Sequence, residues 1–513
     1  MKAKKMSINI LASLVAFFVQ FGISFFLSPY IVSRLGEEAY GFINLSNNFV
    51  SYASLLAVAV NSMASRFISI EYNRGNIEKA KKYFSTVFWT NVFFSILVMI
   101  LSMVLVYNLE SVITISPNLV NQVKITFLLS FINLCISFIS TVYTSATFAT
   151  NKMHYNSIIQ IIGNCVKSIL ILVLFFLLRP KIYYLTVAVL INSLVLFFGN
   201  YKVSQKLFPD FDISIRNYSF GLCKNLVKSG VWMVLSNISN LFLNGFDLLF
   251  ANKLLNNALM GRLSIAKQIP LALSNLLGFF SSIFNASITE TYAQGNISNM
   301  EEETKKLLKV LCFLFTVIYA GLFVFGFDFI KLWLNSSNYT ISQLQEIYNL
   351  MIIVLIDIIV STYMYSIHSI FIALNKVKVY SITLFIASLL NMGITYLLLI
   401  NTNLGVYAIS LTSTIVLGIT HGIIIPIYAA KLLNSKWNNF LISELKSWSF
   451  LFFLVVIFVL IKCVFPTINN FVTFLWQVVI CGIVGYILSF TIVLNKHERG
   501  IIIRKFILKN NNK

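Results

Sequence analysis

Charged residues and catalytic signatures are both scarce in this 513-residue chain. Only 11% of the residues are Asp, Glu, Lys or Arg, whereas 58% are hydrophobic and the mean hydropathy is +0.85. Soluble domains carry about 25% charged residues, so an ordinary water-soluble enzyme and a disordered protein are both excluded. The six cysteines form no CxxC pair, histidine occurs only four times, and no HExxH, GxSxG or P-loop pattern is present. We therefore expect no enzymatic activity, no metal site and no cofactor.

Long hydrophobic runs, in contrast, recur from one end of the chain to the other. A helix of about 20 apolar residues crosses the hydrocarbon core of a bilayer. Fourteen such runs fill nearly the whole chain and predict an all-α polytopic membrane protein without a sizeable soluble domain. The predicted spans cover residues 7–32, 40–69, 85–107, 121–150, 156–178, 183–200, 225–250, 258–288, 309–332, 345–373, 379–399, 405–430, 447–465 and 471–494.

The net charge of +21 points first to nucleic acid, but the positions of the basic residues favour a membrane. They occupy short loops between apolar runs, which is typical of the cytoplasmic loops of membrane proteins. Of the 38 Lys and Arg residues, 28 lie on the side of the two termini, eight lie on the opposite side, and Lys167 and Lys267 fall inside spans. This bias predicts that both termini are cytoplasmic and that nucleic acid is not a partner.

The chain also repeats itself at an offset of about 220 residues. Residues 68–77 match 288–297 around a Gly-Asn-Ile sequence, and residues 149–152 match 373–376, in both cases at the cytoplasmic end of a span. Six spans separate the copies, so both copies have the same orientation. Parallel repeats in transporters place the substrate path between two halves. We therefore predict an N-terminal six-helix lobe at 1–210, a C-terminal six-helix lobe at 211–440, helices 13 and 14 at 441–494, and a basic cytoplasmic tail at 495–513.

Polar side chains share one face of several predicted spans. In the seventh span Asn240, Asn244 and Asp247 follow one another at helical spacing, and Asn47 begins a similar stripe in the second span. Such residues either form hydrogen bonds between packed helices or line a hydrated cavity. The whole set favours a cavity between the two lobes.

Four ionisable residues lie inside predicted spans, where a charge is costly unless it has a partner or water. They are Lys167, Lys267, Asp247 and Asp357. Two interpretations stay open. Asp247 and Lys267, on adjacent spans, would form a structural ion pair, or these residues would bind a substrate or an ion.

Several sequence segments together resemble a known family. They are Pro-Tyr-Ile-Val-Ser-Arg-Leu-Gly at 29–36 with Ala39-Tyr40-Gly41, the segment from Arg66 to Lys82, and Ala-Thr-Asn-Lys at 149–152. With fourteen spans, the chain is similar to the polysaccharide-transporter branch of the multidrug/oligosaccharidyl-lipid/polysaccharide flippase superfamily. This branch includes the O-antigen and capsule-repeat flippases.

The resemblance implies the function and the location. An undecaprenyl-pyrophosphate-linked oligosaccharide would move by alternating access from the inner to the outer leaflet of the bacterial inner membrane, for cell-surface polysaccharide synthesis. The implied partners are this substrate, membrane lipids, and the polysaccharide polymerase and glycosyltransferases.

A pyrophosphate headgroup needs positive charge along its path. Lys167 and Lys267 would supply it within the membrane, with Arg34 and Arg262 near the outer mouth and Arg66 near the inner one. Arg66 alternatively extends to the lipid headgroups. Since no ATP site is visible, the energy for transport would come from an ion gradient or from consumption of the flipped lipid outside. Asp247 and Asp357 are the candidate sites for a coupling ion, either H⁺ or Na⁺.

Two rival functions stay open. A multidrug exporter of the same architecture would favour an acidic, aromatic cavity, whereas here intramembrane bases balance the acids. A polytopic polysaccharide polymerase would need a long outer loop with Arg or His, whereas the longest predicted outer segments, 108–120 and 333–344, are short.

Overall fold

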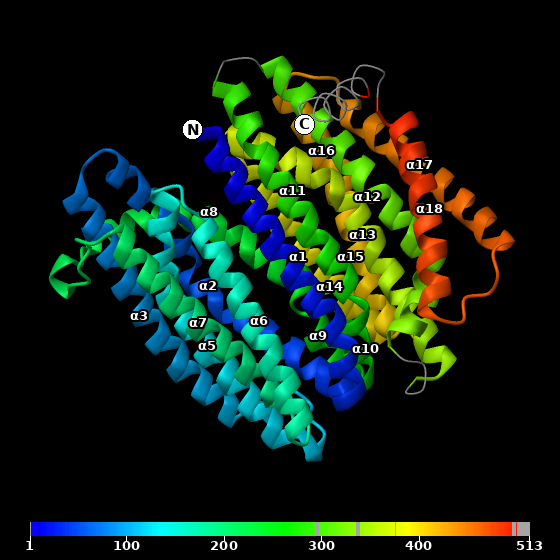
Figure 1. Cartoon of the computed structure of the whole chain (residues 1–513), viewed down its shortest axis with the longest axis horizontal. Helices are drawn as coiled ribbons and strands as arrows, with labels where there is room; N and C mark the ends of the chain where they lie inside the picture. The colour runs from blue at the N-terminus through cyan, green and yellow to red at the C-terminus, as the bar shows by residue number, and fades with distance from the viewer. Residues whose placement is uncertain (1, 294–296, 335–338, 375, 495–498, 500–513) are drawn as a thin grey trace, which may run out of the picture. The chain divides into compact units, whose positions relative to one another are not determined.

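The computed structural model describes residues 2–293, 297–334, 339–374, 376–494 and 499 (Figure 1). Within these residues the regular secondary structure is entirely helical, without a β-strand. The helices of eight residues or more are α1 Lys2–Leu35, α2 Glu37–Asn73, α3 Ile77–Tyr107, α5 Val120–Ala149, α6 His154–Leu177, α7 Ile182–Leu207, α8 Phe220–Asn244, α10 Asn257–Ala266, α11 Gln268–Ala293, α12 Ile297–Trp333, α13 Ile341–Ala373, α14 Val377–Asn401, α15 Val406–Ile419, α16 Ile425–Leu432, α17 Asn439–Val464 and α18 Phe471–Ile492. Shorter elements are the helices α4 Leu109–Val112 and α9 Asp247–Phe250, the 3-10 turns Pro117–Leu119 and Ile215–Asn217, and the π-helical turns Ala251–Leu255 and Thr420–Ile424.

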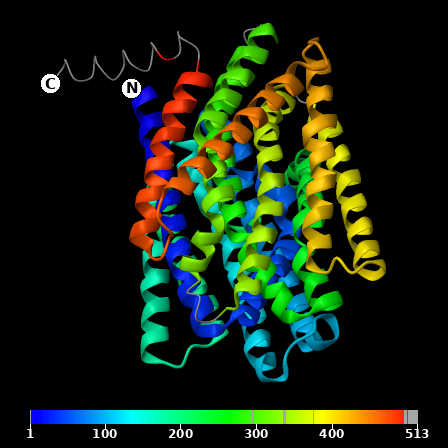
Figure 2. The same cartoon turned by 90° about the vertical axis from the view of Figure 1, so that its right-hand side faces the viewer.

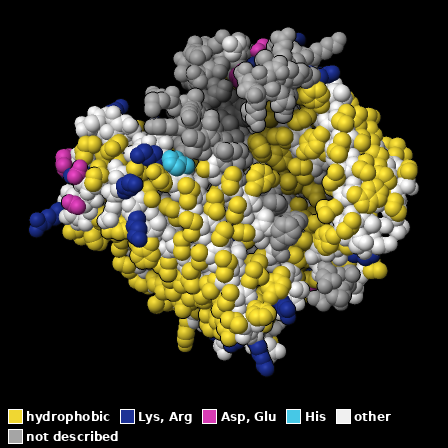
Figure 3. All heavy atoms as spheres, viewed as in Figure 1, with side chains coloured by type: hydrophobic (Ala, Val, Ile, Leu, Met, Phe, Trp, Pro, Cys, Tyr) yellow, Lys and Arg dark blue, Asp and Glu magenta, His cyan; other side chains and the backbone are white. Residues whose placement is uncertain are grey.

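Thirteen candidate membrane spans lie within the described residues, each long and apolar enough to cross a bilayer. They coincide one for one with the predicted spans 2–14, and the predicted span 7–32 lies within the 34-residue helix α1. The prediction of an all-α, multi-pass membrane protein is thus confirmed. Figure 3 shows hydrophobic side chains over most of the visible described surface, with the charged side chains nearer its margins.

Some helices extend well beyond the apolar runs that predicted them. α12 begins at Ile297 rather than at residue 309, and α17 begins at Asn439 rather than at residue 447. The apolar run marks only the part of a helix that lies in hydrocarbon, whereas Glu and Lys are good helix formers and continue it into the polar region. As a result Glu444, which the predicted boundaries placed in a loop, lies inside α17 with its side chain buried.

Each of the two predicted tight hairpins is closed by a backbone hydrogen bond of the same type. After α5 the chain turns through Asn151, whose φ is 53°, and the amide of Lys152 donates to the carbonyl of Thr147 at 2.8 Å. This six-to-one bond closes a helix end around a left-handed residue. The amide of Lys376 donates in the same way to Phe371 at 2.9 Å. In both hairpins the accepting carbonyl lies in the last turn of the preceding helix, α5 or α13.

The described chain forms two compact units. Unit 1 comprises Met1–Ile265 and Leu384–Ile409, and unit 2 comprises Ala266–Thr383 and Ser410–Lys513. Unit 1 includes α8 and α9, because α8 packs along α2 and α3. The two lobes expected from the repeat stay a prediction.

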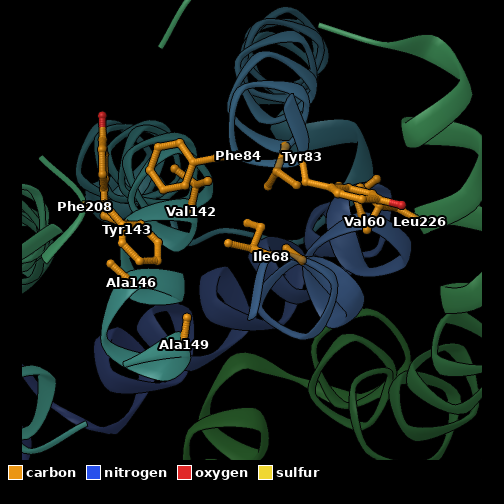
Figure 4. Packing of buried hydrophobic residues seen from close by; sticks show 12 residues of the cluster. Val60, Ile68, Tyr83, Phe84, Val142, Tyr143, Ala146, Ala149, Phe208 and Leu226 are labelled. Carbon is orange, nitrogen blue, oxygen red and sulfur yellow. The ribbon is translucent and has the colours of Figure 1, made fainter. Parts of the chain in front are cut away.

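The core of unit 1 is an aromatic cluster where α2, α3 and α5 meet the start of α8 (Figure 4). Phe84 of α3 lies with its ring centroid 6.0 Å from Tyr143 of α5. The ring centroid of Phe208, directly after α7, lies 4.6 Å from that of Tyr72 on α2. These rings bury a large apolar area and fix the three helices and the connection from α7 to α8 as one body.

The core of unit 2 includes the last two helices. α17 and α18 both pack against α12, as Figure 2 shows in orange to red beside green. Phe458 of α17 is 1% exposed, and a Cβ atom added to Gly485 of α18 would lie 2.8 Å from its ring. Glycine at this point therefore lets α18 approach α17 closely.

Candidate functional site

A membrane-spanning helix is interrupted in unit 1. α8 ends at Asn244, and the same candidate span continues through α9 and a π-helical turn. The carbonyl of Gly245 accepts hydrogen bonds from the Tyr52 hydroxyl at 2.5 Å and from Asn48 Nδ2 at 2.8 Å. Broken helices at membrane depth occur where the freed backbone is buried in protein or lines a cavity, often at the substrate site of a transporter. We refer to Gly245 and Phe246, between α8 and α9, as the α8 break.

Four of the predicted site residues lie around the α8 break. Asp247 is the first residue of α9 and is 3% exposed, whereas Asn240 and Asn244 have exposed side chains on α8. Asn47, also exposed, precedes the Asn48 that contacts the break. The packing of α2 on α8 thus brings the predicted polar residues of the second and seventh spans into one region.

Three predicted basic residues lie elsewhere in unit 1. Arg34, in the last turn of α1, is exposed and has its guanidinium 5.6 Å from the centroid of the Tyr30 ring. Arg66 is exposed on α2, about 27 Å from Asn48 at the helical rise of 1.5 Å per residue. Lys167 is half-buried on α6, which packs on α1 and α7. Among the described residues, these three bases form no hydrogen bond or ion pair with the α8 break.

Arg262 belongs to a polar cluster on the face predicted to be extracytoplasmic. Its Nε lies 3.3 Å from both carboxylate oxygens of Glu37, at the start of α2. Next to this pair, Glu38 accepts from Asn257 at 2.8 Å and from Ser116 at 2.5 Å. The cluster ties the first turn of α2 to α10 and to the connection that follows α4. We call it the outer clamp; its members are Glu37, Glu38, Ser116, Asn257 and Arg262.

Two contacts beside the outer clamp join residues that are 220 positions apart. Asn44 Nδ2 donates to Ser264 Oγ at 3.3 Å, and a Cβ atom added to Gly41 would lie 3.0 Å from the Cα of Gly261. This separation equals the offset of the sequence repeat. Each contact therefore joins a residue to its predicted repeat counterpart, and the parallel repeat itself stays a prediction.

The ion pair of the outer clamp is expected to contribute to stability, because both side chains are more than four-fifths buried. Replacing Glu37 by Gln or Arg262 by Gln should each lower the melting temperature. A double-mutant cycle of thermal unfolding in detergent should give a coupling free energy of about 0.5–3 kcal/mol.

The control for this cycle is the more exposed pair Lys124–Glu110, whose carboxylate is 58% exposed. Such surface pairs contribute about 0–1 kcal/mol. If the two clamp substitutions change the free energy of unfolding by strictly additive amounts, the ion pair contributes nothing to stability.

An apolar groove of about 390 Å³ lies in unit 1 between α2, α3 and α5. Tyr52, which binds the α8 break through its hydroxyl, contributes its ring to the groove. The other lining residues are apolar except for one serine; they include Phe49, Leu56, Val98, Leu101 and Phe131. The polar break and the apolar groove thus share one side chain.

Unit 2 contains the remaining two predicted site residues, both buried within candidate spans. Lys267, between α10 and α11, and Asp357, on α13, are each 7% exposed. Ser361, one turn further along α13, donates a hydrogen bond to Asp357 Oδ1 at 3.4 Å.

The predicted site residues did not include Asn48, Tyr52 and Gly245. An Asn-Gly pair inside an apolar run, here Asn244-Gly245, is a turn signal that would have located the break. The partners on α2 carry no local signal, because only the packing of two distant helices reveals them.

Comparisons with known proteins agree with this architecture. Residues 7–284 match the family described as polysaccharide biosynthesis protein. The uncharacterized membrane protein EpsK of Bacillus subtilis (strain 168) is 26% identical over 502 residues, which cover 98% of each chain.

Two solved structures share the fold at low sequence identity. An inward-facing multidrug resistance MATE family transporter of the MOP superfamily has a TM-score of 0.69 and 13% identity over 83% of this chain and 98% of its own. The lipid II flippase MurJ, in an inward closed conformation, has a TM-score of 0.67 and 18% identity over 97% of this chain and 99% of its own.

Proposed function

The chain belongs to the polysaccharide biosynthesis protein family, and on that premise we propose that it is a flippase for an undecaprenyl-pyrophosphate-linked oligosaccharide. The substrate would move from the cytoplasmic to the outer leaflet of a bacterial cell membrane by alternating access. The resemblance to the polysaccharide branch of the superfamily is confirmed by the family match, and the MOP-type fold by the two solved structures.

The observation that carries the choice of substrate is the buried lysine Lys267 within a membrane span. A base at this depth is costly, and such residues mark substrate or ion pathways. A lipid-linked diphosphate is an anion that must cross the same hydrocarbon. Lys267, together with the half-buried Lys167, would offset its charge during the passage.

Neutral polar groups and apolar surface suit the two other parts of such a substrate. The exposed amides of Asn47, Asn240 and Asn244 around the α8 break would form hydrogen bonds with sugar hydroxyls. The apolar groove beside Tyr52 suits a prenyl chain. Arg34, Arg66 and Arg262 would attract the headgroup at the two membrane surfaces; Arg262 would do so as part of its pair with Glu37.

The energy source would be an ion gradient. Asp247 and Asp357 are buried carboxylates within candidate spans, and each would bind a coupling cation, H⁺ or Na⁺. The distribution of basic residues favours cytoplasmic termini, and the polysaccharide polymerase and glycosyltransferases would act on the same substrate on either side of the membrane.

Depletion of the protein in its native host tests this function. Lipid-linked oligosaccharide should accumulate in the cytoplasmic leaflet, where an added membrane-impermeant glycosidase cannot reach it in intact cells. Surface polysaccharide should fall in parallel. Accumulation of unpolymerised oligosaccharide in the outer leaflet would instead indicate a polymerase.

A multidrug exporter is the second candidate, because the MATE family transporter has the TM-score of 0.69. In that case depletion would sensitise cells to cationic drugs, and export of the lipid-linked oligosaccharide would continue at its normal level. The match to MurJ over 97% of the chain, which extends over the last two helices, favours the flippase fold.

A further inference from the structure

A π-helical turn in unit 2 positions a buried histidine. Pro426 follows the turn Thr420–Ile424 and has no amide hydrogen for the carbonyl four residues before it. The helix widens locally at this point and places His421 in the protein interior, 9% exposed. Single π-turns inside α-helices often occur at functional positions.

His421 meets the predicted coupling residue Asp357 through one serine. Ser361 Oγ lies 3.1 Å from His421 Nδ1 and 3.4 Å from Asp357 Oδ1. Asp357 and Ser361 are one turn apart on α13, which packs against the π-turn. The three side chains therefore form a continuous line of carboxylate, hydroxyl and imidazole.

A hydroxyl has one proton to donate, so Ser361 can donate to only one of its two neighbours at a time. It donates to Asp357 when His421 Nδ1 carries a proton and donates to Ser361 Oγ. It donates to His421 when Nδ1 is bare, and a protonated Asp357 then donates to Ser361 Oγ. In each arrangement all three side chains are hydrogen-bonded, and the direction in which protons are donated along the line is reversed between the two.

The far nitrogen of the imidazole is the open end of this line. His421 Nε2 is buried and has no hydrogen-bond partner among the described residues. Other titratable groups face the same region: Tyr365 and His368 lie on α13, and Glu444 lies on α17, which also packs against the π-turn. A Cβ atom added to Gly422, next to His421, would lie 3.7 Å from Glu444 Oε1, which is buried and likewise has no hydrogen-bond partner within the described part of the chain.

We infer that Asp357, Ser361 and His421 form a proton-binding site in which Ser361 relays a proton between the imidazole and the carboxylate. This inference rests on the proposed transport function and identifies the coupling ion at Asp357 as a proton. It adds His421 and Ser361 to the predicted site.

The relay conserves protons at each step. A proton binds His421 Nε2, the Nδ1 proton passes to Ser361 Oγ, and the hydroxyl proton of Ser361 passes to the Asp357 carboxylate. The imidazole is again neutral, with its proton on Nε2, and Asp357 is neutral. The site has gained one proton and its charge has risen by one.

Magnetic resonance of the full chain in lipid nanodiscs tests the relay directly. The ring nitrogens of ¹⁵N-labelled His421 and the carboxyl carbon of ¹³C-labelled Asp357 are followed from about pH 9 to about pH 5, the range in which an imidazole changes charge. The His421→Gln and Asp357→Asn variants assign the two signals. Because the groups share a proton, both signals should change with one midpoint.

Substitution of Ser361 separates a relay from a chance contact. In Ser361→Ala the midpoints of the two signals should move apart by about one pH unit or more, and Ser361→Thr, which keeps the hydroxyl, should restore the common midpoint. Ser366→Ala is the matched control, since Ser366 is buried on the same helix and its hydroxyl has no partner among the described residues.

Three outcomes would overturn the relay. They are identical titrations of the Ser361→Ala variant and the unaltered protein, separate midpoints in the unaltered protein, and an Asp357 signal that responds to Na⁺ at constant pH but not to pH. Because the titration needs no transport substrate, its result is independent of the depletion experiment. Failure of the relay with normal depletion results would leave the flippase function intact.

Discussion

Replacing Lys167 or Lys267 by Gln is expected to stop export of the lipid-linked oligosaccharide while the protein stays in the membrane at its normal level. Both bases lie in candidate spans, and Lys267 is 7% exposed. If the diphosphate is their partner during transport, removal of either charge raises the cost of moving an anion through hydrocarbon. Arg should restore export in part, since it keeps the charge but changes the shape. Export and protein abundance are measured in the same cells.

The alternative role for Lys267, a structural pair with Asp247, gives a different result. Lys267→Gln would then leave a buried carboxylate without its partner and destabilise the protein by about 3–5 kcal/mol. Adding Asp247→Asn should restore the stability. Lys253→Gln is the control, because Lys253 is exposed and its ammonium donates to the Ser111 carbonyl. Normal export by both Lys→Gln variants would exclude the cationic pathway and favour the multidrug exporter.

Replacing Gly230 by Val is expected to disrupt the packing of α8 on α2 and to leave little folded protein. A Cβ atom at this position would lie 2.0 Å from the carbonyl oxygen of Ala59. The Cβ atom is fixed to the backbone of α8 and would meet the backbone of α2, so the clash is relieved only if the two helices move apart. Overpacking of a core costs about 1–3 kcal/mol where side chains adjust, and more is expected here. The measurement is the yield and melting temperature of the purified protein in detergent.

Gly321 on α12 provides a control for that substitution. A Cβ atom at Gly321 would meet nothing within 4 Å. Gly321→Ala should leave the melting temperature equal or raise it, because Ala favours a helix by about 1 kcal/mol over Gly. Folded Gly230→Val protein with an unchanged melting temperature would show that α8 and α2 do not pack as closely as these distances indicate.

The helices could be predicted from the sequence because hydropathy is a local property. Thirteen predicted spans coincide with candidate membrane helices, and the remaining span lies within α1. The ends were harder to predict, since the polar turns of α12 and α17 continue beyond the hydrocarbon. That error placed Glu444 in a loop, although its side chain is 2% exposed in α17.

The site could be predicted only in its composition. The sequence identified Asp247, Lys267 and Asp357 as intramembrane charges, and all three are buried. It did not reveal which side chains meet, because the bond from Tyr52 to Gly245 spans 193 positions and the contact from Ser361 to His421 spans 60. The position of His421 depends on the π-turn Thr420–Ile424 before Pro426, which hydropathy does not reveal.

The close approach of Gly41 to Gly261 limits which residues the outer clamp tolerates beside it. A Cβ atom added to Gly261 would lie 2.3 Å from the carbonyl oxygen of Glu37, and one added to Gly41 would lie 3.0 Å from the Cα of Gly261. Because both contacts are with backbone atoms, no change of a side-chain rotamer relieves them. The ion pair between Glu37 and Arg262 therefore depends on two residues that have no side chain of their own to contribute.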